Sequence, residues 1–181
     1  MGLEKYHRSE NSFMGKDTEN HCLGYPLNWE EIISEEDIDP NQERGFRWWA
    51  KKIRSVYPKE EAINPMPKSK WSTDLFNMVL ESLDLDPEKL EDQGLHFYKT
   101  TGSILDRMGV DAMFTYKDPE TKKEKTVTID ITENPNKDTY KADIIIYKPP
   151  TRSDQEYEQR MNEIAEEIAK KLKEKPGETI H

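Results

Sequence analysis

Cysteine is almost absent from this chain of 181 residues, which contains only Cys22. One cysteine cannot form an internal disulfide, so a reducing compartment is the default expectation. The chain also has no apolar run long enough to span a bilayer, and its first residues lack the apolar segment of a secretion signal. These absences predict a soluble, cytoplasmic protein that has no membrane partner.

Hydrophobic residues and positive charge are scarce as well. Hydrophobic residues make up 33% of the chain and charged residues 35%, a balance close to that of disordered proteins. Part of the chain is therefore expected to lack a core of its own. The net charge of -10 opposes indiscriminate binding to a polyphosphate, because such binding depends on Lys and Arg side chains that displace counterions. A contact with nucleic acid would need a local basic patch or a bridging metal ion.

Common motifs of metal and nucleotide binding are missing too. The four histidines and Cys22 do not have the spacing of zinc ligands. Asp37, Asp39 and Asn41 resemble the start of a calcium loop, but Gln42 stands where that loop requires glycine. The sequence contains no P-loop, dinucleotide-binding fingerprint or nucleophile elbow.

Three segments of different composition divide the chain. Residues 1–45 are expected to form a polar, irregular N-terminal extension, in which the acidic segment 29–39 can form a short helix that ends at Pro40. Residues 46–70 start with the pattern of an amphipathic helix and continue into a proline-rich connection. Residues 71–181 are expected to form an α/β core that ends in a long helix.

The stretch from Phe46 to Arg54 interleaves aromatic and basic residues. Arg and Trp side chains together can bind phosphate and stack on bases, so this stretch is the one plausible nucleic-acid surface. The alternative is an amphipathic helix that packs on the core and keeps its charges in water.

Hydrophobic periodicity predicts the order of elements within residues 71–181. The expected elements are a helix capped by Ser72 or Thr73 and ending at 84–87, a short strand or loop at 95–98, hairpin strands at 110–117 and 125–132, a third strand at 140–147, and a helix that starts at a capping box over 153–156 and ends at Pro176. The continuous apolar run in the third strand predicts a central position that is covered on both faces. Together these elements predict a central mixed β-sheet flanked by helices.

Asp111 and Asp130 interrupt two segments that otherwise read as strands. Asp111 follows Gly109 closely at the start of the first segment, and Asp130 lies within a β-branched run in the second. An acid in a strand is unfavourable unless something compensates for it. Carboxylates on adjacent strands of a hairpin can converge within a few ångströms, and a shared divalent cation relieves their repulsion. The pattern therefore predicts a metal site formed by Asp111 and Asp130.

This arrangement resembles the PD-(D/E)XK nuclease superfamily, which has the restriction-endonuclease-like fold. In that family an aspartate on one strand of a hairpin is followed, on the next strand, by an acid, a spacer and usually a lysine. Asp111 matches the first position, and Asp130-Ile131-Thr132 matches the second with Thr132 where lysine is expected. The order of elements over about residues 71–174 also fits a restriction-endonuclease-like core in αβββα order. The resemblance implies a nuclease that uses Mg²⁺ or Mn²⁺ to hydrolyse phosphodiester bonds in DNA or RNA.

Thr132 is the main departure from the family pattern. The family's lysine helps to orient or deprotonate the attacking water and offsets phosphate charge, and threonine can do neither with the same strength. Lys141 on the third strand, or Lys137 before it, could substitute. Many relatives also place an acid on the preceding helix, but Glu81 lies opposite the apolar stripe of that helix and is expected on the surface. For Asp106, an ion pair with its neighbour Arg107 or a turn cap is the expected role.

Two other classes of function remain open. The first is a catalytically inactive nuclease-like fold that binds a protein or nucleic-acid partner or acts as an acidic mimic of nucleic acid. Thr132 and the net charge of -10 favour this alternative. The second is a structural protein whose aspartates only satisfy hydrogen bonds. The convergence of two strand acids favours the enzyme.

Overall fold

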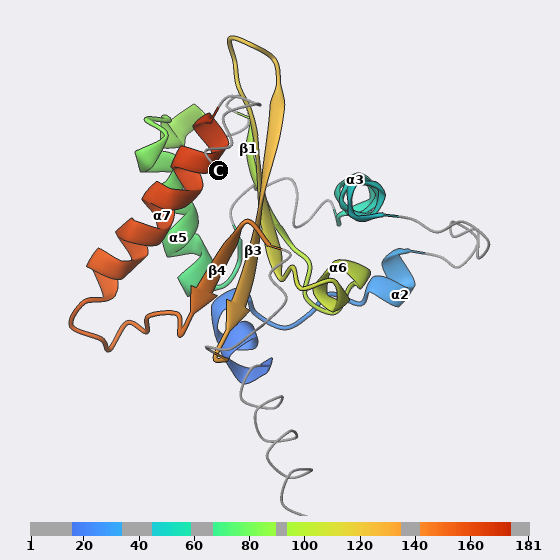
Figure 1. The fold of residues 1–181 in the computed structure, drawn as a ribbon, viewed down its shortest axis with the longest axis horizontal. Coiled ribbons are helices and arrows are strands. Elements are labelled where there is room, and N and C mark those ends of the chain that lie inside the picture. Colours follow the sequence, from blue (N-terminus) through green and yellow to red (C-terminus); the bar gives the residue numbers. More distant parts are fainter. Residues whose placement is uncertain (1–15, 34–44, 59–66, 90–93, 135–141, 175–181) are drawn as a thin grey trace, which may run out of the picture.

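A four-stranded β-sheet with helices on both sides forms the centre of the computed structural model (Figure 1). The structure describes residues 16–33, 45–58, 67–89, 94–134 and 142–174. The chain is an α/β protein with a central mixed sheet flanked by helices, as its hydrophobic periodicity predicts. Lys137 and Lys141 lie outside the described residues.

The sheet has the strand order β1-β2-β3-β4. Its strands are β1 (Leu95–Lys99), β2 (Ala112–Lys117), β3 (Glu124–Thr132) and β4 (Ile144–Tyr147). The pairs β1/β2 and β2/β3 are antiparallel, whereas β3 and β4 are parallel. The expected hairpin is therefore present, but the described core contains a fourth strand, β1, that the αβββα order does not include.

The position predicted for the third apolar strand is wrong, because β4 forms an edge of the described sheet. Ile144 and Ile146 are buried on one face, while Ile145 between them is only partly buried. An apolar run of this length fits a short edge strand as well as a central one, since periodicity does not report how many neighbours a strand has.

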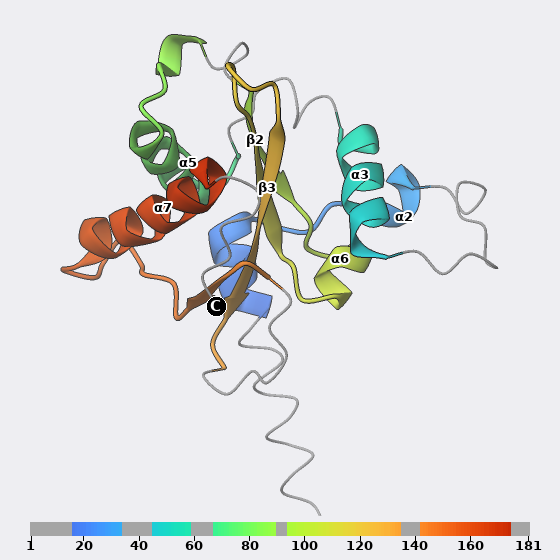
Figure 2. The same cartoon turned by 45° about the horizontal axis from the view of Figure 1, so that its top comes forward.

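Two long helices cover one face of the sheet in both views (Figures 1 and 2). They are α5 (Lys70–Ser82) and α7 (Tyr157–Lys173). The core beneath them includes Phe76, Phe114 and Met161, which are fully buried. The rings of Phe76 and Phe114 stack with their centroids 6.1 Å apart. The alternating apolar residues of β2 and β3 supply the sheet side of this core.

Three shorter helices lie on the other face of the sheet (Figure 2). These are α2 (Trp29–Ile32), α3 (Phe46–Val56) and α6 (Ile104–Arg107). A second core there contains Ile53, Leu105, Val110 and Met113, all fully buried. A short 3-10 helix, η2 (Pro87–Lys89), follows α5. The opposite face of the sheet is therefore also covered, and by helices that come mostly from the N-terminal part of the chain.

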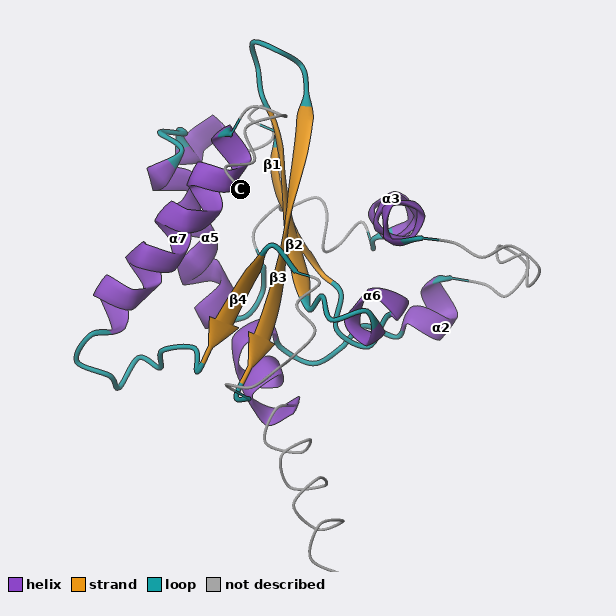
Figure 3. Ribbon diagram, viewed as in Figure 1, coloured by secondary structure: helices purple, strands orange, loops and turns teal. Residues whose placement is uncertain are grey.

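Residues 16–23 form a helix beside the carboxyl ends of β3 and β4 (Figure 3). Cys22 and Leu23 belong to the main core, with 1% and 4% of their surface exposed. The expectation of an irregular extension therefore does not hold for this segment, whereas α2 lies where a short helix was expected. The segment has too few apolar residues to show a helical period, and its order comes from contacts with distant parts of the chain.

The helix starts differ from those that the sequence predicts. Ser69 caps α5 in place of Ser72 or Thr73, and its Oγ accepts a hydrogen bond from the Ser72 amide at 3.2 Å. Before α7 no side chain caps the helix, so the expected capping box is not formed. Asp154 instead accepts a hydrogen bond from the Thr151 amide at 2.7 Å. A short polar side chain serves a turn as readily as a helix start, and the local sequence does not distinguish the two.

The carboxyl end of α5 provides a test of backbone strain. Asp84 has a φ of 59°, and the Asp84 and Leu85 amides bond back to the carbonyls of Glu81 and Leu80. This is the pattern of a Schellman motif, in which glycine is preferred at the left-handed residue. We expect Asp84→Gly to raise the free energy of unfolding by roughly 1 kcal/mol. Asp84→Ala is the control, because it removes the carboxylate but keeps the Cβ atom. Urea denaturation that shows equal or lower stability for the glycine variant would contradict the prediction.

Candidate metal centre

A sharp turn after α6 directs the chain toward Asp111. Gly109 has a φ of 81°, its amide donates to the Asp106 carbonyl at 2.8 Å, and the next amide, of Val110, donates to the Leu105 carbonyl at 3.0 Å. These two bonds form a second Schellman motif, with Val110 and Leu105 packed in the same core. Gly109 is therefore needed for the helix end, and this turn places the following residue, Asp111, beside β3.

Asp111 precedes β2 and continues its pairing with β3. The Asp111 amide donates to the Ile129 carbonyl at 2.8 Å, and the Asp111 carbonyl accepts from the Thr100 amide at 2.8 Å. Its carboxylate Oδ2 accepts a hydrogen bond from the Ile131 amide at 2.7 Å. Only 2% of Asp111 is exposed, so the carboxyl group is fixed in a buried position.

Asp130 lies on β3 next to Asp111 and is 3% exposed. The register pairs Ala112 with Ile129, and both of these residues face the α5/α7 core. Because side chains alternate along a strand, Asp130 points to the opposite face, on the side of α6. Adjacent strands therefore bring the two predicted aspartates near each other, with Asp111 just outside β2.

Two further carboxylates approach Asp111 more closely than the sequence indicates. Glu19, from the helix at residues 16–23, and Asp106, from α6, each offer an oxygen that lies within 4.8 Å of the other two ligand atoms in a group with Asp111. Three carboxylates at this spacing provide the hard oxygen ligands that Mg²⁺ and Mn²⁺ prefer. Asp130 is not part of this group of three, and its role as a metal ligand stays a prediction.

Contacts far apart in sequence hold Glu19 in this place. Thr18 donates a hydrogen bond to the Glu133 carboxylate at 3.0 Å, just after the end of β3. The Ser69 hydroxyl donates to the Cys22 carbonyl at the other end of the helix. Burial, together with the charges of Glu133 and Glu19, raises the pKa of the Cys22 thiol to about 12. Sequence reasoning missed Glu19 because the segment that carries it has no pattern that points to the sheet.

Asp106 has the turn-capping role that was expected, and it also belongs to the acidic group. Its Oδ2 accepts a hydrogen bond from the Gly102 amide at 2.7 Å. Within the described part of the chain, Asp106 forms no ion pair with Arg107. The hydrogen bond from Gly102 fixes the Asp106 side chain against the loop between β1 and α6. In this position one of its carboxylate oxygens lies within 4.8 Å of a carboxylate oxygen of Asp111.

The pKa of Asp111 is raised to about 8. Burial is the main cause, followed by the negative charge of Glu19, and the charges of Asp130 and Asp106 act in the same direction. The hydrogen bond from the Ile131 amide opposes these effects. At neutral pH the Asp111 carboxyl therefore keeps its proton unless a positive charge is added to the cluster. A divalent cation bound by these oxygens would supply that charge.

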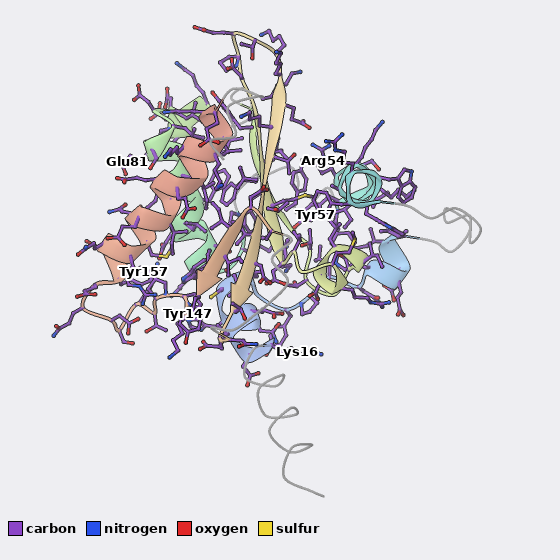
Figure 4. All side chains as sticks on the ribbon, in the orientation of Figure 1. Lys16, Arg54, Tyr57, Glu81, Tyr147 and Tyr157 are labelled. Atoms are coloured by element: carbon purple, nitrogen blue, oxygen red, sulfur yellow. The ribbon has the colours of Figure 1, made fainter. Side chains whose placement is uncertain are left out.

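The other sequence-predicted positions take different roles. Thr132 is buried, with 8% of its surface exposed, and its hydroxyl accepts a hydrogen bond from the Asn134 amide at 3.1 Å. This bond closes a turn after β3. Glu81 is exposed on α5, as expected from its helical position. Figure 4 shows it on the side of the sheet opposite to Arg54 of α3, and hence away from α6.

The basic helix α3 packs against the sheet through Ala50 and Ile53. Arg47 and Lys51 are exposed, and Arg54 forms an ion pair with Glu124 of β3. The expected amphipathic helix is therefore present, with its charged residues outward. The binding of nucleic acid by these charges stays a prediction.

Comparison with known proteins gives no family model, no curated protein and no solved structure that matches this chain. Among the described residues, no helix is both long and apolar enough to cross a lipid bilayer. The resemblance to the PD-(D/E)XK nucleases therefore stays a prediction.

Proposed function

We propose that this protein is a divalent-metal-dependent nuclease that hydrolyses phosphodiester bonds in DNA or RNA. The observation that supports this function best is the buried Asp111 carboxyl group within 4.8 Å of oxygens from Glu19 and Asp106. Burying several acids together is unfavourable unless they share a cation or a proton. Asp111, Asp106 and Glu19 would hold Mg²⁺ or Mn²⁺, with Asp130 as a neighbouring acid that adds negative charge.

A bound divalent ion would activate water and stabilise the negative charge that develops on the scissile phosphate. The chain's own residues contribute the position of the ligands. The Ile131 amide holds the Asp111 carboxylate, and the Gly102 amide holds the Asp106 carboxylate. The Thr132 hydroxyl carries no positive charge and is already bonded to the Asn134 amide, so we assign the lysine role of the family to Lys141 as a proposal.

An inactive binding protein is the second candidate, and one observation favours it. Asp111 has a purely structural partner in the Ile131 amide, which would explain an acid at this position without a metal. The burial of Asp111 and Asp130 argues against the particular form in which these two residues mimic nucleic acid, because a mimic must present its carboxylates to solvent. A measurement of metal binding distinguishes the proposed nuclease from an inactive binding protein and from a nucleic-acid mimic.

Thermal melting with and without Mg²⁺ or Mn²⁺ tests the metal site directly. A ligand that binds only the folded state adds about 1.4 kcal/mol at ten times its Kd, which corresponds to a rise in Tm of roughly 3–6 °C for a chain of this size. We expect Glu19→Gln to remove most of this rise, since it removes one charged ligand. Glu167→Gln on the exposed side of α7 is the matched control and should keep it. An equal rise in both variants, or none in the wild type at millimolar metal, would exclude a specific site.

A further inference from the structure

A cavity of about 490 Å³ lies between α2, α3 and α6, next to the acidic cluster. Its lining includes Trp29, Glu30 and Ile33 at α2, Trp49 of α3, and Ser103 and Arg107 at α6. A volume of this size is typical of pockets for small molecules. The three helices that surround it lie on one side of the sheet in both views (Figures 1 and 2).

Two indole rings contribute to the lining of the cavity. Trp29 is 6% exposed, and its Nε1 donates a hydrogen bond to the Thr101 carbonyl at 2.9 Å, which holds the ring in place. Trp49 is half-buried, and its ring packs edge-on against Trp48 with the centroids 4.8 Å apart. Trp49 keeps part of its surface exposed, so its ring can stack on a flat ligand such as a nucleobase, whereas the buried Trp29 ring forms part of the wall.

Of the residues that the structure describes, one cation, Arg107, lines this cavity, although the chain as a whole carries a net charge of -10. Arg107 is exposed and forms no ion pair within the part of the chain that the structure describes. Trp49 is the residue of α3 in this lining, and the cations Arg47, Lys51 and Arg54 lie on the opposite side of the helix from it, where Arg54 pairs with Glu124. Among the described residues, Glu30 is the one acid that lines the cavity. Arg107 can therefore hold one anionic group of a ligand whose flat ring lies in the cavity.

The cavity and the acidic cluster share one short segment of chain. Asp106 belongs to the cluster, and the next residue, Arg107, lines the cavity. Gly102 also lines the cavity, and its amide holds the Asp106 carboxylate at 2.7 Å. A ligand in the cavity would therefore lie close to the carboxylates that the proposed function assigns to the metal.

We propose that this cavity binds one unpaired nucleobase of a single-stranded nucleic acid, with a neighbouring phosphate held by Arg107. A base within a duplex is stacked on both sides and cannot enter such a cavity unless it is flipped out. The inference deepens the proposed nuclease function, on which it rests for the assignment of a substrate, by naming that substrate as a single strand. Binding itself needs no metal and can be measured without cleavage.

The test is a fluorescence-anisotropy titration of the full chain in EDTA. The probe is a fluorescein-labelled DNA or RNA single strand of about 12 nucleotides, a length within the range that single-strand sites cover. The same sequence as a duplex is the comparison. We expect the single strand to bind at least about tenfold more tightly than the duplex, since stacking contributes roughly that factor for each base that it captures.

Four variants divide the binding into its parts. Trp49→Ala should weaken single-strand binding about tenfold, whereas Trp49→Phe should retain most of it. Arg107→Gln should weaken binding. It should also reduce the slope of log K against log salt concentration by the amount that corresponds to about one phosphate contact. Glu30→Gln should strengthen binding, a gain that a merely structural role for this residue does not produce. Lys170→Gln removes an exposed cation from α7 on the opposite face and is the matched control, with no change expected.

Three outcomes would overturn the inference. The first is equal affinity for the duplex and the single strand. The second is a Trp49→Ala variant that melts like the wild type and loses no more affinity than Lys170→Gln. The third is displacement of the probe by a polyglutamate peptide as effectively as by the unlabelled single strand. The last outcome would indicate an acidic protein partner instead. The nuclease proposal can fail separately. Tight binding of the single strand without metal-dependent cleavage would support the cavity assignment and contradict the nuclease proposal. Metal-dependent cleavage without a preference for single strands would support the nuclease proposal and contradict the cavity assignment.

Discussion

Replacing Asp111 by Asn should reduce metal-dependent cleavage of DNA or RNA by about 10²- to 10³-fold or more, the effect of removing one preorganised group that stabilises transition-state charge. Asp111 is the most deeply buried member of the acidic group, so its charge is the least screened by water. Asn has nearly the same shape, and its Oδ1 can still accept the hydrogen bond from the Ile131 amide. The loss of activity would therefore report the loss of a charged ligand.

The measurement is cleavage of a panel of single-stranded and duplex DNA and RNA with Mg²⁺, with Mn²⁺ and with EDTA. Asp130→Asn is expected to lower the rate as well, because Asp130 adds negative charge next to Asp111. Glu167→Gln should cleave like the wild type. Wild-type protein that cleaves no substrate with either ion, but still binds a protein or nucleic-acid partner, would establish the inactive binding protein in place of the enzyme.

Lys141→Ala tests whether this lysine has taken the role that Thr132 cannot fill. A positioned acid-base group typically contributes about 10²- to 10⁴-fold to the rate. We expect a loss in this range with an unchanged melting temperature and an unchanged response of that temperature to metal. Thr132→Lys is the converse variant, although a lysine at this buried position must also lose the hydrogen bond from the Asn134 amide. Activity of Lys141→Ala equal to that of the wild type would remove Lys141 from the site.

The largest expected effect on stability concerns the proton of Asp111. Its pKa is about 8 in the folded state and near the ordinary value of 3.8 in the unfolded chain. Between these values the folded state binds more protons than the unfolded state, so without metal this group makes the free energy of unfolding fall as pH rises. The slope approaches about 1.4 kcal/mol per pH unit for one group. Its contribution is fully present below pH 4 and is lost as pH passes through about 8.

Asp111→Asn should remove this slope. Near pH 4 the variant should have the same free energy of unfolding as the wild type. Near pH 8 its free energy of unfolding should be higher than that of the wild type by an amount on the order of a few kcal/mol. Denaturant titrations in EDTA at several pH values provide the comparison, and the difference between the two proteins isolates Asp111 from other titrating groups. Millimolar Mg²⁺ should narrow the gap at high pH, since only the wild type has the charged ligand. A difference that is constant with pH would show that Asp111 ionises normally in the folded protein.

The cleavage rate and the pH-dependent stability of Asp111→Asn together distinguish a metal-binding Asp111 from a purely structural one. A purely structural Asp111 predicts that the Asn variant loses stability at all pH values, because the best acceptor for the Ile131 amide is weakened. A metal ligand predicts the opposite for the protein without metal, namely a more stable but inactive variant. Functional sites commonly hold such unfavourable groups at a cost to stability.

The sequence by itself determined the elements that have a strong local pattern. The apolar periodicity of α5 and α7, and the alternation in β2 and β3, place each element correctly because these patterns record which side of a helix or strand is buried. The same alternation places Asp130 on the face opposite Ile129 and Ile131, next to the start of β2. The sequence therefore predicts that Asp130 lies near Asp111, although Asp111 stands just before β2 and not on it.

The tertiary structure alone decided which other groups surround Asp111. Glu19 comes from a segment more than ninety positions earlier, and it reaches the site only because the helix at residues 16–23 is bonded to Glu133 and Ser69. The edge position of β4 and the choice of Ser69 as the cap of α5 have the same origin. Local patterns report burial along one element, whereas the neighbours of an element depend on contacts between distant parts of the chain, and no periodicity within either partner encodes them.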